Sequence, residues 1–239
     1  MKVAIYVEGI TEAAFVYRLI GEQYQWDWSA FRMECLHLDP AKAASDLHDY
    51  GDENSKDYFL IYDSGSDSAV SSDIRDRFEN HRDNGFDKVV GLRDVYSERF
   101  IDLYGRQMNR NHIDSFIYDM QDTLAQYDST GFIRLRFAIM ETESWLLAMS
   151  DVFSRIDHRI DAQWLIDRVQ IDVNDNPESA YFHPFSHLVD IYTSVSRTYS
   201  KHWDEIKEII FKLSQNDFDM LYNSGKCPSF RDFVDAIFI

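Results

Sequence analysis

The sequence is poor in cysteine, proline and glycine for its length. Its 239 residues include 2 Cys, 4 Pro and 9 Gly. This composition excludes a disulfide-rich scaffold, a collagen-like chain and a low-complexity linker. Cys35 and Cys227 belong to no CxxC pair and show no zinc-ligand spacing, so we expect two thiols in a reducing compartment.

Long hydrophobic runs are also absent. Charged residues interrupt every apolar stretch well before the roughly 20 residues needed to span a bilayer. The opening segment, MKVAIYVEGITE, carries Glu8 and Glu12 within a short apolar run, which is not the pattern of a secretory signal peptide. We therefore expect a cytoplasmic protein with no membrane partner.

Basic residues are few relative to acidic ones. The chain has 24 Lys and Arg against 42 Asp and Glu, for a formal net charge of −18. Proteins that coat nucleic acid nonspecifically rely on a basic surface, so this class is disfavoured. A metal-dependent enzyme can carry an acidic site, because a bound cation inverts the local electrostatics. It still needs basic groups or a partner to hold a phosphate backbone.

What the sequence does contain is enough apolar residues for a core, arranged in short runs. Hydrophobic residues make up 45% and aromatic residues 15% of the chain, which is typical of a folded protein. Apolar runs predict strands at residues 2–7, 32–38, 58–62 and 87–92, and a strand near an edge at 132–139. Helical patterns lie between them, including a long, polar segment over residues 98–126. Apolar strands that alternate with helices predict an α/β fold with a mostly parallel sheet covered on both faces.

The pattern of predicted elements changes near residue 150. Beyond it we find short helical patterns, an acidic loop and an amphipathic stretch at residues 203–213. The sequence therefore predicts an α/β domain at residues 1–150 and a mainly helical C-terminal subdomain at residues 151–239 packed on it.

Acidic residues end several of the predicted strands: Glu8, Asp63, Asp94 and Glu141. Functional groups of an open parallel sheet gather beyond the carboxyl ends of its strands. One such carboxylate is more often a helix cap. Several together repel one another unless a cation compensates, and oxygen ligands suit Mg²⁺ or Mn²⁺ better than Zn²⁺.

Three further groups are weaker candidates. Glu143 follows Glu141 at i, i+2, so the two side chains diverge where the chain turns helical; Glu143 could instead favour the start of that helix. His183 and His187 lack an HExxH pattern, which makes a metal role for them a minor alternative. Lys201 could stabilise negative charge on phosphorus, or could be a solvated surface charge. No P-loop, dinucleotide or GxSxG motif is present.

Three motifs resemble those of TOPRIM domains. Residues 7–12 (VEGITE) follow the first strand, residues 91–94 (GLRD) end a later strand, and residues 140–147 (METESWLL) form an acidic third motif. Together with His183-Pro184 and Tyr199-Ser200-Lys201, they resemble a family of uncharacterised TOPRIM-like bacterial proteins related to the OLD (overcoming lysogenization defect) nucleases. The resemblance covers most of the chain. It departs from the TOPRIM DxD, because Asp94 is followed by Val95-Tyr96.

The resemblance implies a TOPRIM-like, Rossmann-like fold and assigns roles to individual residues. Glu8 would be the first-motif glutamate, a metal ligand or acid/base group, and Asp94 the central metal ligand. Glu141 and Glu143 would be the later acidic pair of metal ligands, and Lys201 would be the catalytic basic residue that some relatives use near the scissile phosphate. Members of this family are often encoded beside an ATPase and are suspected of acting in anti-phage defence.

The leading hypothesis is a Mg²⁺- or Mn²⁺-dependent hydrolase that cleaves phosphodiester bonds in DNA or RNA. The alternative is a non-catalytic acidic TOPRIM-like subunit that binds a partner ATPase, favoured by the net charge and the imperfect DxD. A third reading, a phosphatase or transferase acting on small nucleotides, would use the same site. The sequence leaves open whether a second copy of the chain is a partner.

Overall fold

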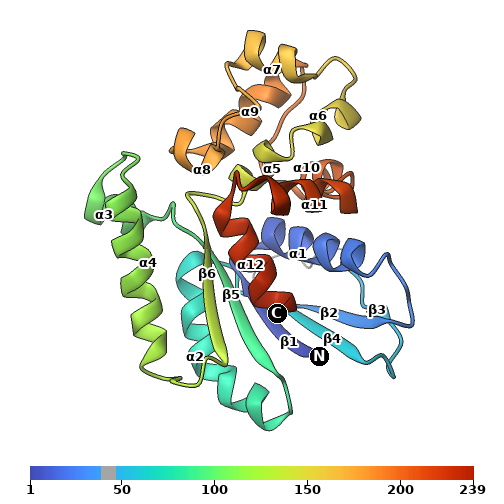
Figure 1. Cartoon of the computed structure of the whole chain (residues 1–239), viewed down its shortest axis with the longest axis vertical. Coiled ribbons are helices and arrows are strands. Elements are labelled where there is room, and N and C mark those ends of the chain that lie inside the picture. The colour runs from blue at the N-terminus through green and yellow to red at the C-terminus, as the bar shows by residue number, and fades with distance from the viewer. Residues whose placement is uncertain (39–46) are drawn as a thin grey trace. The chain divides into compact units, whose positions relative to one another are not determined.

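The computed structural model describes residues 1–38 and 47–239. These residues form two compact units (Figure 1). The first unit comprises Met1–Arg93, Asp114–Phe137 and Phe233–Ile239, and the second comprises Asp94–Ile113 and Ala138–Asp232. The second unit therefore begins earlier in the chain than the boundary predicted at residue 150.

The first unit contains a six-stranded sheet with the order β3-β2-β4-β1-β5-β6. Its strands are β1 (Lys2–Val7), β2 (Phe31–His37), β3 (Tyr50–Gly51), β4 (Asp57–Asp63), β5 (Lys88–Asp94) and β6 (Ile133–Ala138). The apolar runs of the sequence mark five of these strands correctly. The two-residue strand β3 was not predicted, because it is too short to leave a periodic pattern.

Most of the sheet is parallel. β1 pairs in parallel with β4 and β5, and β2 pairs in parallel with β4, whereas β3 runs antiparallel to β2. β6 lies at the edge beside β5, where the backbone of Val89 donates a hydrogen bond to the carbonyl of Phe132 at 2.8 Å. β1 and β5 are buried almost throughout because helices cover both faces of the sheet. The predicted α/β class is confirmed.

Helices cover the two faces of this sheet. α2 (Asp67–Asp83) and α4 (Arg110–Ala125) lie on one face, where Arg93 of β5 reaches both helices. α1 (Ile10–Gln23) and the last turns of α12 (Pro228–Phe238) lie over the ring of Phe59 on the other face. Gly91 allows α2 to approach β5 closely, because a Cβ there would lie 2.6 Å from Ile74 Cδ1.

The helical segment predicted for residues 98–126 is divided into two helices. α3 (Glu98–Tyr104) ends at Gly105, whose φ of 76° is in the left-handed region that favours glycine. α4 begins only at Arg110. Ser97 caps α3, since its hydroxyl accepts a hydrogen bond from the backbone of Phe100 at 3.2 Å.

The second unit is built from helices around its own core. Besides α3 they are α5 (Glu143–Ala148), α6 (Asp151–Ile156), α7 (Ala162–Val169), α8 (Pro177–Ala180), α9 (Pro184–Ser194), α10 (Trp203–Ile210), α11 (Gln215–Ser224) and the start of α12. Trp145 is fully buried against Phe230, and its indole donates a hydrogen bond to Ser229 Oγ at 3.0 Å. Residues 151–239 contain helices and no strand. Within the described ranges, no helix combines the length and hydropathy needed to cross a bilayer.

Candidate functional site

The segment after β6 places two acidic side chains inside the second unit. The chain turns sharply at Met140, whose φ of 62° lies in the left-handed region. Ser144 holds this turn because its hydroxyl donates to the carbonyl of Ile139 at 3.0 Å. Glu141 is 5% and Glu143 0% exposed. Carboxylates buried to this degree need compensating partners.

Glu141 is compensated by the start of α9. His183 Nδ1 lies 3.1 and 3.0 Å from its two carboxylate oxygens, and the backbone of Phe185 donates to Oε2 at 2.8 Å. The ring of Tyr96 stacks on His183 at a centroid distance of 4.5 Å. Burial and the neighbouring charge of Glu143 raise the pKa of Glu141, and the Phe185 N–H, Lys201 and His183 partly oppose this rise.

Glu143 is compensated by a lysine from the loop before α10. Lys201 Nζ lies 2.7 Å from Glu143 Oε1, while the lysine side chain remains 35% exposed. The same ammonium lies 5.2 Å from the ring centroid of Phe185, within the range of a cation–π contact. Glu141 and Glu143 therefore have different side-chain partners, a histidine ring and a lysine ammonium, although Phe185 contacts both sets.

Asp94 reaches the same acidic segment. It is buried at the end of β5, and its Oδ1 accepts a hydrogen bond from the backbone of Thr142 at 3.1 Å. The structure thus brings together Asp94, Glu141, Glu143 and Lys201, four of the five predicted site residues, within one unit. Carboxylates are the ligands that a hard divalent cation prefers, and one of these three, Glu143, already pairs with an ammonium.

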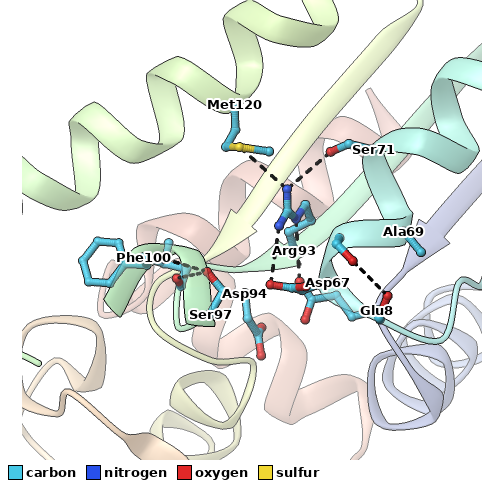
Figure 2. A network of polar contacts seen from close by, with 12 residues as sticks. Glu8, Asp67, Ala69, Ser71, Arg93, Asp94, Ser97, Phe100 and Met120 are labelled. Atoms are coloured by element: carbon cyan, nitrogen blue, oxygen red, sulfur yellow. Dashed lines mark hydrogen bonds and ion pairs between the residues drawn. The ribbon is translucent and has the colours of Figure 1, made fainter. Parts of the chain in front are cut away.

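Glu8, the fifth predicted site residue, lies in the first unit. Arg93 Nε lies 3.8 Å from Glu8 Oε1, and Arg93 Nη2 lies 3.7 Å from Asp67 Oδ2 (Figure 2). The guanidinium also contacts Ser71 Oγ at 3.4 Å and Met120 Sδ at 3.8 Å. Arg93 is only 3% exposed, so Glu8 lies beside a buried and permanently charged cation.

Asp63, the remaining strand-end acid, has partners of its own in the first unit. His37 Nδ1 lies 2.8 Å from its Oδ2, and the backbone of Gly65 donates to its Oδ1 at 2.9 Å. The second contact is the local capping role that a single strand-end carboxylate most often has. Across residues 1–38 and 47–239, no three His, Cys, Asp or Glu side chains are already arranged as ligands of one metal ion.

Sequence reasoning gave His183 little weight, yet it contacts Glu141. His187, four residues later, packs its ring on Tyr181 instead, at a centroid distance of 4.2 Å. Spacing alone does not separate the two histidines, because His183 precedes the first residue of α9 whereas His187 lies within that helix. Comparisons of the chain with family models, with curated proteins and with solved structures find no match.

Proposed function

We propose that this chain is a Mg²⁺-dependent phosphodiesterase of TOPRIM type that cleaves DNA or RNA. One observation supports this most directly. Two buried carboxylates, Glu141 and Glu143, lie in a single turn of the chain. The ammonium of Lys201 lies 2.7 Å from Glu143. Asp94 is tied to the same turn through Thr142. Mn²⁺ would serve in place of Mg²⁺, since both prefer oxygen ligands.

Each residue has a role that follows from its surroundings. Asp94, Glu141 and Glu143 would hold the cation, which when bound polarises the phosphate and supplies an activated water. His183 and the Phe185 N–H fix the Glu141 carboxylate in place. Lys201 would neutralise charge that develops on the phosphate. Exposure of its side chain leaves the ammonium within reach of a ligand.

The substitution Glu143→Gln tests this proposal. It keeps the shape of the side chain and removes the charge, so we expect Mg²⁺-dependent cleavage of labelled DNA or RNA to fall by about 100-fold or more. Glu79→Gln is the matched control, because Glu79 is exposed on α2 and loses the same charge. Full activity of the Glu143 variant, in protein that unfolds at the wild-type temperature, would contradict the assignment.

Glu8 requires its own experiment, because it lies in the first unit. The resemblance assigns it a metal-binding or acid/base role, and this stays a prediction. Glu8→Ala should then abolish metal-dependent cleavage while the protein remains folded by circular dichroism. If Glu8 only accompanies Arg93, the variant will instead keep its activity and lose stability.

The alternative is a non-catalytic acidic subunit that docks on an ATPase, and the net charge of −18 favours it. The two proposals differ in what Mg²⁺ does to the folded protein. A ligand that binds only the folded state raises its stability. Absence of any thermal shift at millimolar Mg²⁺ or Mn²⁺ would favour the subunit, and a saturable shift would favour the enzyme.

A further inference from the structure

The buried carboxylate of Glu143 is already neutralised by a cation of the chain itself. Glu143 is fully buried, and Lys201 Nζ lies 2.7 Å from its Oε1. A carboxylate removed from water requires a paired positive charge. Lys201 therefore supplies the charge that a divalent cation would supply at the same carboxylate.

The backbone around Lys201 is arranged to place this ammonium. Lys201 has a φ of 59°, a left-handed conformation that non-glycine residues adopt only when neighbouring contacts hold it. Glu205, in the first turn of α10, provides those contacts. Its carboxylate accepts hydrogen bonds from Thr198 Oγ1 and Ser200 Oγ, both at 3.0 Å, and from the backbone of His202 at 3.3 Å. The loop on both sides of Lys201 is thus anchored to one side chain.

The ring of Phe185 offers the ammonium a second contact. Lys201 Nζ lies 5.2 Å from the ring centroid, so the positive charge keeps a favourable partner when its distance to Glu143 grows. Because the lysine side chain is 35% exposed, it also has solvent into which it can move. The Glu143 side chain is enclosed, so it has no solvent into which it can move.

We propose that Lys201 is a resident cation of the acidic site, which neutralises Glu143 until a divalent cation takes its place. An ammonium and a divalent cation at one buried carboxylate repel each other. Metal binding therefore displaces Lys201 from Glu143 and frees the ammonium for the phosphate of the substrate. This inference rests on the proposed function and adds a coupling between metal binding and the position of the lysine.

Isothermal titration of the full chain with Mg²⁺ and with Mn²⁺ tests the displacement. Lys201→Met removes the competing charge, so we expect the metal Kd to fall about tenfold. Lys207→Met is the matched control, because Lys207 Nζ also lies near a carboxylate, Asp204, at 3.0 Å and over an aromatic ring, that of Trp203, but at the surface. We expect its Kd to change by less than twofold. Glu205→Gln should tighten metal binding by a smaller factor than Lys201→Met.

The outcomes separate this inference from the proposed function. If the wild type binds metal and Lys201→Met binds it equally or more weakly, the displacement is wrong and the metal site stands. If neither protein binds Mg²⁺ or Mn²⁺ at millimolar concentration, the proposed function fails and the displacement fails with it.

A second measurement uses the unmodified protein and so does not depend on how a variant folds. Reductive methylation followed by peptide mass spectrometry reports how available each lysine ammonium is. We expect Mg²⁺ to raise the rate of modification of Lys201 several-fold and to leave that of Lys207 unchanged. A Lys201 rate that is constant or falls on metal addition would overturn the displacement.

Discussion

The two units pair candidate site carboxylates with different cations. In the first unit, Glu8 lies 3.8 Å from Arg93, a guanidinium buried to 97% that stays charged at any working pH. In the second, Glu143 lies 2.7 Å from Lys201, an ammonium on a flexible stem that reaches solvent. The first cation is enclosed by its packing, whereas the second is partly exposed and, under the displacement proposed above, would give way to a divalent cation.

The two cations also differ in the elements that hold them. Arg93 contacts two helices from the end of a buried strand, so its charge belongs to the packing of the first unit. The partners of Glu141 and Glu143 come instead from the start of α9 and the loop before α10. A site that must bind and release a cation is better served by the second arrangement.

Removing Arg93 should have the largest effect on stability. Arg93→Met deletes the buried charge beside Glu8 and Asp67, whose side chains are 15% and 32% exposed, so solvent screens part of the loss and the cost is about 2 to 3 kcal/mol. We expect this loss in the free energy of unfolding by urea, with or without Mg²⁺. Recovery of stability in this variant on addition of Mg²⁺ would contradict the contrast between the two units, because Glu8 would then also bind an exchangeable cation.

His81 should make the first unit sensitive to acid. Its Nε2 lies 2.6 Å from the hydroxyl of buried Tyr6, and burial lowers its pKa from 6.5 to about 4. Because the folded state favours the neutral ring, the stabilisation is complete above about pH 6.5 and is lost as pH falls toward 4. His81→Gln should remove about 2 kcal/mol of this pH dependence. Urea unfolding at pH 7 and pH 4.5 measures it.

The control for this prediction is His158→Gln, since the side chain of His158 is 95% exposed. That variant should retain the wild-type loss of stability between pH 7 and pH 4.5. An equal acid response in wild type and His81→Gln would show that other groups govern the acid stability of the first unit.

Glu178 should make the stability of the second unit depend on pH as well, by a smaller amount and in the opposite direction. Burial raises the pKa of its carboxyl, while hydrogen bonds from Ser229 and Trp145 partly oppose this rise. A raised folded-state pKa stabilises the protein below the ordinary value of 4.5, and this contribution is lost as pH rises through the folded-state pKa. Glu178→Gln should flatten this loss, measured by urea unfolding at pH 4.5 and pH 7.5. If the stability of the variant falls with rising pH as steeply as that of the wild type, Glu178 does not cause the loss.

The local pattern of the sequence was sufficient to predict the frame of the fold. Runs such as residues 2–7 and 87–92 are apolar on both sides of the strand, which only a covered parallel sheet can bury. The strand-end positions of Glu8 and Asp94 followed from the same runs, because the apolar residues stop where the strands stop. The break between the two helices at Gly105 could not be predicted in this way, since a helical pattern continues on both sides of it.

The partners of the acidic residues were decided only by the tertiary structure. His183 and Glu141 are 42 residues apart, and nothing in either local sequence distinguishes this histidine from His187. The same holds for Arg93, whose packing against α2 and α4 sets its distance to Glu8. Periodicity records which side chains are buried, because burial repeats with the backbone. Which buried charges meet depends on how distant elements pack, and that information is not local.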